Sequence, residues 1–276
     1  MRFRFTKMHG LGNDFVVIDA VSQKISITPE RARKISDRNF GVGCDQILIV
    51  EAPRDPSCDF RYRIFNYDGT EVENCGNGAR CFAVFVRQRG LTNKRKIKVQ
   101  TNAGNMILHV HDDDLVTVDM GAPVLTPNDI PFNAENYQKE YSLKLQKSEI
   151  SVGAVSMGNP HAVCVVDHLE SFDVDSIGAE VEEHKDFPSK VNAGFMEVMS
   201  RDEIRLRVFE RGVGETLACG TGACAAAVSG NLRGLLSSNI TVHLPGGDLH
   251  IQWEGEGKSV FMTGPATTVF HGQIRL

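Results

Sequence analysis

Apolar and polar positions alternate along much of the chain, a pattern that predicts β-strands. The runs at 60–65, Phe-Arg-Tyr-Arg-Ile-Phe, and 203–209, Glu-Ile-Arg-Leu-Arg-Val-Phe, place an apolar side chain at every second position, as expected of half-buried strands. Strand composition predicts the full set at 3–8, 14–19, 46–50, 59–66, 96–101, 105–111, 114–120, 150–156, 161–166, 194–199, 203–209, 239–244, 248–253 and 258–263.

Four segments with helix signals separate these strands. They begin with residues that favour a helix N-terminus, such as the N-cap Thr28 followed by Pro29, or end at a glycine, such as Gly90 or Gly234. The predicted helices run from 29 to about 39, from near 75–77 to 90, over 172–184, and from near 219–221 to just before 234.

The order of elements repeats, and so do some residues. Residues 75–79, Cys-Gly-Asn-Gly-Ala, align with 219–223, Cys-Gly-Thr-Gly-Ala, at an offset of 144 positions. Each stretch lies between a predicted strand and a predicted helix, so the match indicates a duplication. We predict an α/β (α+β) fold of two pseudo-symmetric domains, 1–120 and 121–263, with a proline-rich linker at the start of the second.

Composition narrows the class of protein. The 276 residues carry 30 Lys and Arg against 35 Asp and Glu, a net charge of −5, so no basic excess is present to neutralise nucleic-acid phosphates. No apolar run approaches the ~18 residues of a membrane span, and the N-terminal residues lack the apolar core of a signal peptide. Seven cysteines, an odd number, indicate free thiols in a reducing compartment. We expect a cytoplasmic protein without nucleic-acid or membrane partners.

Several site chemistries lack a sequence signal. The chain has no Cys-x-x-Cys pair, no Gly-x-Gly-x-x-Gly and no Walker-type loop, so zinc, thioredoxin-like and nucleotide sites are not predicted. His109 and His111 alternate on a predicted strand without a third ligand at suitable spacing. This favours surface or cross-strand histidines, and we predict no metal site.

Cys75 and Cys219 are each predicted to lie where a strand and a turn lead into a helix. The unpaired N–H groups and the positive dipole end of a first helical turn favour thiolate and can lower a cysteine pKa from ~8.5 to roughly 3.5–7.5. The adjoining glycines leave those N–H groups open to an anion. The other cysteines are expected to be small buried side chains: Cys44, Cys58, Cys81, Cys164 and Cys224.

Two equivalent thiols facing one cleft would suit a reaction that inverts a carbon centre. One thiolate removes a proton from one face, the other thiol returns a proton to the opposite face, and the roles exchange in the reverse direction. The carbanion of an amino acid needs stabilisation, which helix N-termini can provide at its carboxylate. Such chemistry requires neither pyridoxal phosphate nor a metal.

Longer motifs around these cysteines resemble those of the diaminopimelate epimerases. Residues 73–81, Glu-Asn-Cys-Gly-Asn-Gly-Ala-Arg-Cys, are similar to the first active-site signature of that family, and residues 210–222 are similar to the second. Further matching segments occur in the family order at 9–15, 43–46 and 157–161. The resemblance implies an enzyme that interconverts LL- and meso-diaminopimelate without a cofactor, in lysine and peptidoglycan precursor biosynthesis.

The resemblance also implies the fold and the site. Each domain would be a mixed sheet wrapped around a central helix, with 264–276 returning to the first domain. Cys75 and Cys219 would be the acid and base, and His161 and Glu210 would tune their pKa values. The implied substrate-binding residues are Asn13, Gln46, Asn66, Gly76, Asn77, Asn159, Asn192, Glu210, Arg211, Gly220 and Thr221.

Phe270 matches a family position at which a tyrosine supports a homodimer. Here the aromatic area is kept without the hydroxyl. Phenylalanine is also among the most buried residue types, so Phe270 could belong to the core. We expect a homodimer, because aromatic residues are enriched at interface cores and twofold dimers are the commonest oligomers.

Four other functions are compatible with parts of the sequence. A two-cysteine racemase acting on proline or hydroxyproline would not need the charged pair Glu210 and Arg211. An isomerase of the same fold without thiol chemistry would not need both cysteines. A redox switch could join Cys75 and Cys219 in a disulfide, but no resolving thiol is indicated. A non-catalytic binding module would use the asparagines and leave the duplicated cysteines unexplained.

Overall fold

The chain folds into two compact units. The computed structural model describes residues 2–72 and 76–275. One unit comprises Met1–Asp119 together with Thr263–Leu276, and the other comprises Met120–Met262.

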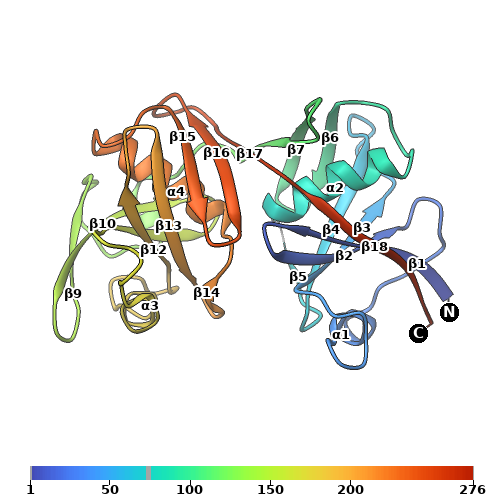
Figure 1. The fold of residues 1–276 in the computed structure, drawn as a ribbon, viewed down its shortest axis with the longest axis horizontal. Coiled ribbons are helices and arrows are strands. Elements are labelled where there is room, and N and C mark those ends of the chain that lie inside the picture. The colour runs from blue at the N-terminus through green and yellow to red at the C-terminus, as the bar shows by residue number, and fades with distance from the viewer. Residues whose placement is uncertain (1, 73–75, 276) are drawn as a thin grey trace. The chain divides into compact units, whose positions relative to one another are not determined.

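The first unit is a mixed sheet in which each strand pairs mainly with its neighbours in sequence (Figure 1). β1 pairs antiparallel with β2, β2 parallel with β3, β3 antiparallel with β4, β4 parallel with β6, and β6 antiparallel with β7. β18 pairs antiparallel with β1, and the short β5 pairs with β4. The strands are β1 (Arg2–Gly10), β2 (Asn13–Asp19), β3 (Gln46–Glu51), β4 (Phe60–Asn66), β5 (Glu71–Val72), β6 (Lys96–Thr101), β7 (Gly104–Val110), β8 (Val116–Asp119) and β18 (Thr267–Arg275).

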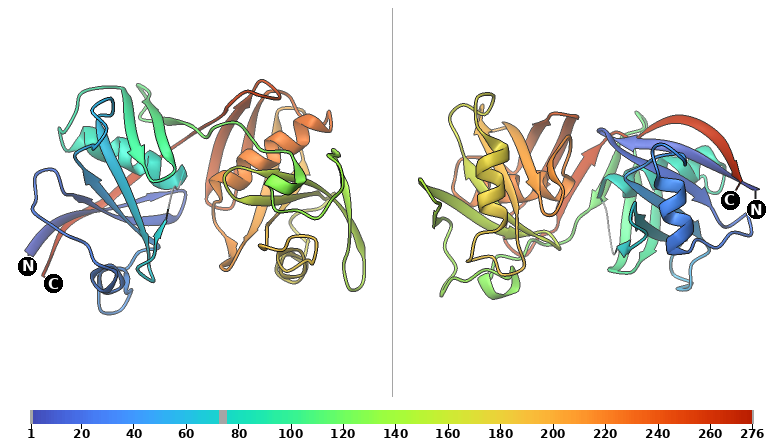
Figure 2. Two further views of the ribbon diagram at one scale, coloured as in Figure 1. Left: turned by 180° about the vertical axis from the view of Figure 1, so that it is seen from behind. Right: turned by 90° about the horizontal axis from the view of Figure 1, so that it is seen from below.

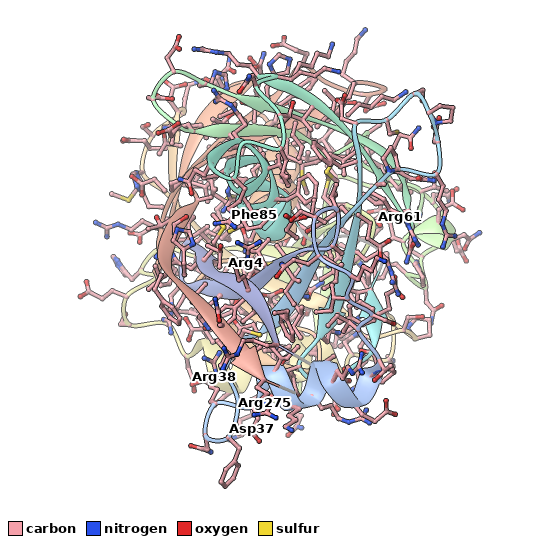
Figure 3. The ribbon with its side chains drawn as sticks, turned by 90° about the vertical axis from the view of Figure 1, so that its right-hand side faces the viewer. Arg4, Asp37, Arg38, Arg61, Phe85 and Arg275 are labelled. Carbon is pink, nitrogen blue, oxygen red and sulfur yellow. The ribbon has the colours of Figure 1, made fainter. Side chains whose placement is uncertain are left out.

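Helix α2 (Gly76–Gln88) is the core of this unit. It contacts β1, β2, β3, β7, β8 and β18, and every residue from its start to Val86 is buried. Phe85, which Figure 3 shows on this helix among the surrounding strands, is 2% exposed. The shorter α1 (Pro29–Ser36) is capped by the Thr28 side chain, as predicted, and contacts β3 and β4. It ends three residues earlier than predicted, because the backbone turns away at Asp37.

The second unit repeats this arrangement (Figure 2). β10 pairs antiparallel with β11, β11 parallel with β12, β12 antiparallel with β13, β13 parallel with β15, and β15 antiparallel with β16. The strands are β9 (Tyr141–Lys144), β10 (Glu149–Ser156), β11 (Pro160–Val165), β12 (Asn192–Val198), β13 (Glu203–Glu210), β14 (Gly214–Thr216), β15 (Asn239–Leu244), β16 (Gly247–Trp253) and β17 (Val260–Gly264).

Helix α4 (Gly220–Leu232) occupies the same place in the second unit as α2 in the first. It contacts β10, β11, β12, β13, β15 and β16. Small residues let the strands approach it closely: a Cβ on Gly153 of β10 would lie 2.1 Å from the Ser229 hydroxyl of α4. The second helix of the unit, α3 (Val174–Glu182), contacts β12, β13 and β14.

The two units therefore share one order of antiparallel and parallel pairings. α1 and α3 join the parallel pairs β2–β3 and β11–β12, and α2 and α4 join the parallel pairs β4–β6 and β13–β15. The short strands β5 and β14 occupy equivalent places before the central helices. This confirms the predicted mixed-sheet fold with pseudo-symmetric halves.

Some elements were not predicted, and each has a local reason. β5 and β14 have two and three residues, too few to show an alternating pattern. The 3-10 turn η1 (Pro127–Asp129) lies inside the segment predicted as a linker. β9 has only four residues, too few for its alternation of buried and exposed side chains to stand out, and it pairs with the start of β10. No helix in the described part of the chain is both long enough and apolar enough to cross a membrane.

Replacing Gly178 with Ala should lower the free energy of unfolding. Alanine normally stabilises a helix by up to ~1 kcal/mol relative to glycine. Here the added Cβ would lie 2.6 Å from Phe209 on β13, and such overpacking costs ~1–3 kcal/mol. Ala179→Ser, at an exposed position of α3, is the control and should change the urea unfolding midpoint only slightly. A midpoint for Gly178→Ala at or above that of the wild type would contradict this packing.

Candidate active site

Cys219 lies at the N-cap of α4, in an extended conformation with φ −113° and ψ 104°. Its side chain is 3% exposed, and its Sγ lies 3.6 Å from the Thr221 hydroxyl. The backbone amide of Gly222 also donates to the sulfur. A Cβ on Gly222 would lie 3.0 Å from Val208 and 3.2 Å from that sulfur, so glycine lets the first turn approach the thiol without crowding. The predicted cradle of first-turn N–H groups is thus present around Cys219.

Glu210, the last residue of β13, lies against the same thiol. Its carboxylate accepts a hydrogen bond from the Thr216 hydroxyl at 2.5 Å. Burial, and then the charge of Glu210, raise the pKa of Cys219 well above its usual value, while Thr221 and the Gly222 amide act in the opposite direction. The lowered pKa expected from the helix N-terminus is therefore wrong for this structure, because desolvation of the thiolate outweighs the first-turn N–H groups.

Arg211 follows directly and is held by the strand beside it. Its backbone N–H donates to Asn192 Oδ1 at 2.9 Å, and the Asn192 amide in turn donates to the Pro160 carbonyl at 2.9 Å. The Arg211 guanidinium donates to the Ser189 carbonyl at 3.0 Å. The guanidinium is thus preoriented in an exposed turn.

His161 is fully buried beside Asn192 and is uncharged. Burial, with a contribution from the charge of Arg211, lowers its pKa to about 3. Its Nε2 lies 3.1 Å from Asn159 Oδ1, and its Nδ1 has no hydrogen-bond partner among the described residues. In the resemblance His161 and Glu210 tune the two thiols. The structure places Glu210 at Cys219, whereas Cys75 lies outside the described residues, so the role of His161 stays a prediction.

In the first unit the predicted residues gather at one end of the sheet. Gln46 begins β3 and pairs in register with Asn66, the last residue of β4. The Gln46 amide donates to Asn66 Oδ1 at 2.8 Å, and the buried Gln46 Oε1 has no hydrogen-bond partner among the described residues. Asn66 also donates to the Thr70 hydroxyl at 3.2 Å. This end of the sheet therefore presents a buried acceptor oxygen.

Asn13 and Asn77 are linked by a hydrogen bond of 3.3 Å from the Asn77 amide to Asn13 Oδ1. Asn13 donates to Asp45 at 3.0 Å, and Asn77 accepts from the guanidinium of Arg80 at 3.0 Å. Arg80 is fully buried in α2 and also donates to the Pro265 carbonyl at 3.0 Å. The two amides are thereby oriented between a cation and an anion.

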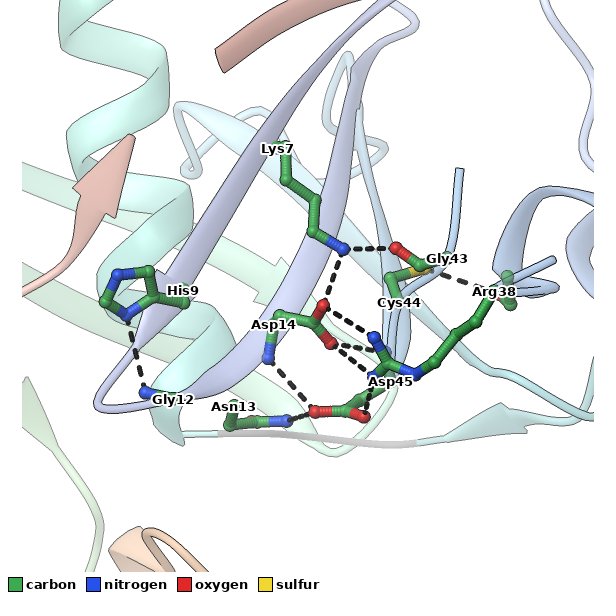
Figure 4. A network of polar contacts seen from close by, with 10 residues as sticks. Lys7, His9, Gly12, Asn13, Asp14, Arg38, Gly43, Cys44 and Asp45 are labelled. Carbon is green, nitrogen blue, oxygen red and sulfur yellow. Dashed lines mark hydrogen bonds and ion pairs between the residues drawn. The ribbon is translucent and has the colours of Figure 1, made fainter. Parts of the chain in front are cut away.

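An ion-pair network adjoins Asn13 (Figure 4). Arg38 donates to both oxygens of Asp14, at 3.0 and 3.1 Å, and to Asp45 at 2.7 Å. Lys7 donates to Asp14 at 2.5 Å and to the Gly43 carbonyl. Burial raises the pKa of Asp14, but Arg38, Lys7 and the Asp45 amide outweigh it and bring that pKa to about 2. Asp14 is therefore ionised at neutral pH and holds the loop that carries Asp45.

The predicted residues of the two units occupy equivalent positions. In the first unit the pairing strands place Phe15 beside Gln46, and in the second they place His161 beside Asn192. Asn66 ends β4 as Glu210 ends β13. The further equivalent pairs are Asn13 and Asn159, Gly76 and Gly220, and Asn77 and Thr221. The duplication thus brings a set of predicted site residues to the same end of each sheet, beside the first turn of its central helix.

Sequence reasoning missed the residues that position this set. Asp45 and Arg80 were inside quoted motifs, but only the structure shows that they orient Asn13 and Asn77.

Of the remaining cysteines, all five are buried as expected: Cys44, Cys58, Cys81, Cys164 and Cys224. His111 contacts the Thr117 hydroxyl at 2.7 Å. Among the described residues no group of three or more His, Cys, Asp or Glu side chains could hold a metal ion.

Solved structures at low sequence identity share the fold of this chain. A probable proline racemase from Agrobacterium radiobacter K84 superposes with a TM-score of 0.73 at 15% identity, over 99% of this chain and 93% of that one. A hydroxyproline epimerase from Agrobacterium vitis superposes with a TM-score of 0.70 at 15% identity, over 99% and 92%. The chain therefore has the two-unit fold found in these amino-acid racemases and epimerases.

The family follows from closer similarity. The model of the diaminopimelate epimerase family matches residues 5–126 and 153–269. A diaminopimelate epimerase from Teredinibacter turnerae is 68% identical over 276 residues, the full length of both chains. This chain belongs to the diaminopimelate epimerase family, as the motifs around the two cysteines predict.

Replacing Glu210 with Gln should lower the pKa of Cys219, because the carboxylate charge beside the thiol is removed. At a fixed pH near neutrality a larger fraction of Cys219 is then thiolate, so it should react faster with iodoacetamide. The measurement is the pH dependence of Cys219 alkylation, followed by peptide mass spectrometry. Glu215→Gln is the control, since Glu215 pairs with Arg207 on the same hairpin. An unchanged or higher pKa in Glu210→Gln would show that Glu210 does not act on the thiol.

Proposed function

We propose that this protein interconverts LL- and meso-2,6-diaminopimelate through a thiolate base and a thiol acid, supplied by Cys75 and Cys219. The observation that carries the proposal is the buried Cys219 thiol at the first turn of α4, beside Glu210. Cys75 directly precedes α2, the equivalent central helix. The full-length similarity to a diaminopimelate epimerase supports the substrate.

Each turnover moves one proton off the α-carbon and one proton on. The thiolate of one cysteine takes the α-proton and becomes a thiol, and the electron pair left on carbon delocalises into the substrate carboxylate. The thiol of the other cysteine delivers its proton to the opposite face and becomes a thiolate. The raised pKa of Cys219 suits the thiol form that serves as the acid.

The first-turn N–H groups would stabilise the charge that develops on the carboxylate. Gly220 and Thr221 begin α4, and Gly76 and Asn77 begin α2, so both helices present N–H groups that have no partner within the helix. Donors fixed in a buried site need no reorganisation during the reaction, which makes them more effective than water. No pyridoxal phosphate and no metal is required for this step.

The second amino-acid head of the substrate requires one group for its carboxylate and one for its ammonium. Arg211 offers an exposed, preoriented guanidinium, whose planar fork suits a carboxylate. The buried Gln46 Oε1 offers an acceptor for an ammonium N–H.

We place the reaction in the cytoplasm, in the supply of lysine and peptidoglycan precursors, because a thiol acid and a thiolate base both require reduced cysteines.

Cys75→Ser and Cys219→Ser should each abolish epimerisation. Serine is a far weaker acid and base than cysteine, so the loss should be at least the ~10²–10⁴-fold typical of a general acid–base group. The assay incubates the reduced enzyme with LL-diaminopimelate in deuterated water and follows α-proton exchange and formation of the meso isomer. Each single variant keeps one thiol and should still exchange from one stereoisomer.

The same assay separates the alternatives. Proline and hydroxyproline are included as substrates, and Cys164→Ser serves as the control because Cys164 is a free thiol buried in β11. Exchange of proline in place of diaminopimelate would identify a different racemase. Substantial epimerisation by both serine variants would refute the two-thiol mechanism.

We also propose a homodimer formed through β18. Val269 and Phe270 on this outer strand are 55% and 46% exposed, and Phe270 packs edge-on against Phe5 at 5.9 Å between ring centroids. The Phe270 ring is thus supported from within its unit while an apolar surface remains open. Apolar exposure of this kind on an outer strand favours a partner of identical sequence.

Light scattering at micromolar concentration should give about twice the 30.4 kDa mass of one chain. Phe270→Asp should shift the mass toward the monomer and reduce activity, because a charge replaces an aromatic contact and dimerisation steadies the unit that carries Cys75. Phe261→Asp is the control, since Phe261 is an exposed aromatic residue on β17. A wild-type mass near that of one chain would reject the dimer.

A further inference from the structure

Glu182 is a buried carboxylate in an unfavourable place. It is the last residue of α3 and is 8% exposed. The C-terminal end of a helix carries partial negative charge, so an anion there is disfavoured, and burial adds a desolvation cost. Specific partners must therefore offset both effects.

Those partners belong to the segments that carry the predicted distal site. The Glu182 Oε1 accepts a hydrogen bond from the Gly212 backbone N–H at 2.8 Å. The Glu182 backbone carbonyl accepts from Val191 N–H at 3.2 Å, and the Lys190 ammonium lies 3.6 Å from the same carboxylate. Glu182 thus joins the turn after β13 to the segment that leads into β12.

The turn around Arg211 is held from two sides in this way. Asn192 Oδ1 accepts a hydrogen bond from the backbone N–H of Arg211. Glu182 Oε1 accepts one from the next N–H along the chain, that of Gly212. Gly212 has φ +74°, a left-handed conformation that glycine adopts readily. The N–H groups of Arg211 and Gly212 both donate to acceptors on other segments. These two hydrogen bonds restrict rotation of the backbone at Arg211.

We propose that Glu182 is a positioning residue that sets the direction of the Arg211 guanidinium for the distal carboxylate of the substrate. The proposal rests on the proposed function and deepens it by adding a residue outside the two cysteine motifs. It requires the acceptor oxygen of Glu182 more than its charge, because the contact with the turn is a hydrogen bond to a backbone N–H. Glu183, the next residue, also contacts Lys190, at 2.9 Å, and within the described part of the chain its side chain makes no hydrogen bond to the Gly212 turn.

The test compares Glu182→Met, which fills a similar volume without an acceptor, with Glu182→Gln, which keeps an acceptor. Loss of a charge-assisted hydrogen bond should lower kcat/KM for diaminopimelate about tenfold or more in Glu182→Met, mainly through KM. Glu182→Gln should stay within about threefold of the wild type. The control Glu183→Met, at an exposed position, should leave both constants unchanged. A tenfold loss in a folded Glu182→Gln would overturn the proposal even if Glu182→Met fails to fold.

A double-mutant cycle shows whether Glu182 acts through Arg211. In an Arg211→Ala background, Glu182→Met should change kcat/KM by less than about twofold, because the group it positions is gone. An equal loss in both backgrounds would make Glu182 a general structural residue and overturn the proposal.

Hydrogen exchange of the Gly212 amide tests the contact without any activity. Protection should be strong in the wild type and in Glu182→Gln and weaker in Glu182→Met. If the wild type does not act on diaminopimelate but this pattern holds, the proposed function fails while the contact stands. If protection is unchanged in Glu182→Met, the contact fails whatever the activity.

Discussion

Burial of the first turn of α4 inside the sheet of its unit sets the chemistry of Cys219. A helix N-terminus at the surface would share its N–H groups with water, whereas here the strands surround it and leave the thiol 3% exposed. Burial excludes water and thereby raises the pKa of Cys219. The same low local dielectric strengthens each hydrogen bond that the first-turn N–H groups donate to an anion. The Cys219 thiol is therefore uncharged near neutral pH, because burial and the Glu210 carboxylate both disfavour the thiolate.

Local patterns were enough to predict most of the fold, because the strands that face the core alternate and the helices carry caps. The run at 203–209 became β13, and Thr28 caps α1. Short strands such as β14 could not be predicted, since three residues show no period. For the candidate site, the motifs pointed to Cys219 and Glu210 and the family resemblance to Asn192, but neither predicted the direction of the Cys219 pKa shift. Position at a helix N-terminus can be inferred from sequence, whereas burial and the approach of Glu210 depend on the folded sheet. Glu182 was missed for the same reason, as it lies 30 residues from the Gly212 amide that it binds.

Duplication explains why the polar residues of the two units correspond, and divergence explains why they differ. Equivalent strand ends carry amides in the first unit, as at Asn66, and charges in the second, as at Glu210. Where the second unit has buried, neutral His161, the first has Phe15. In the first unit the charged side chains do not end the strands. They form the ion-pair network of Lys7, Asp14 and Arg38 next to the amides. A framework that is symmetric in its backbone has thus become asymmetric in its electrostatics.

That asymmetry fits the proposed reaction, which is nearly symmetric at one carbon atom and asymmetric in the rest of the substrate. Inversion of a carbon needs one proton-transfer group on each face, and in the proposed mechanism Cys75 and Cys219 would be those groups. The remainder of an elongated substrate extends in a single direction from that carbon, so recognition of its far end breaks the symmetry. Arg211, fixed by Asn192 and by Glu182, has no charged counterpart at the equivalent Tyr67. Under the proposed function, only the second unit would therefore supply a cation at this position for the distal carboxylate of the substrate.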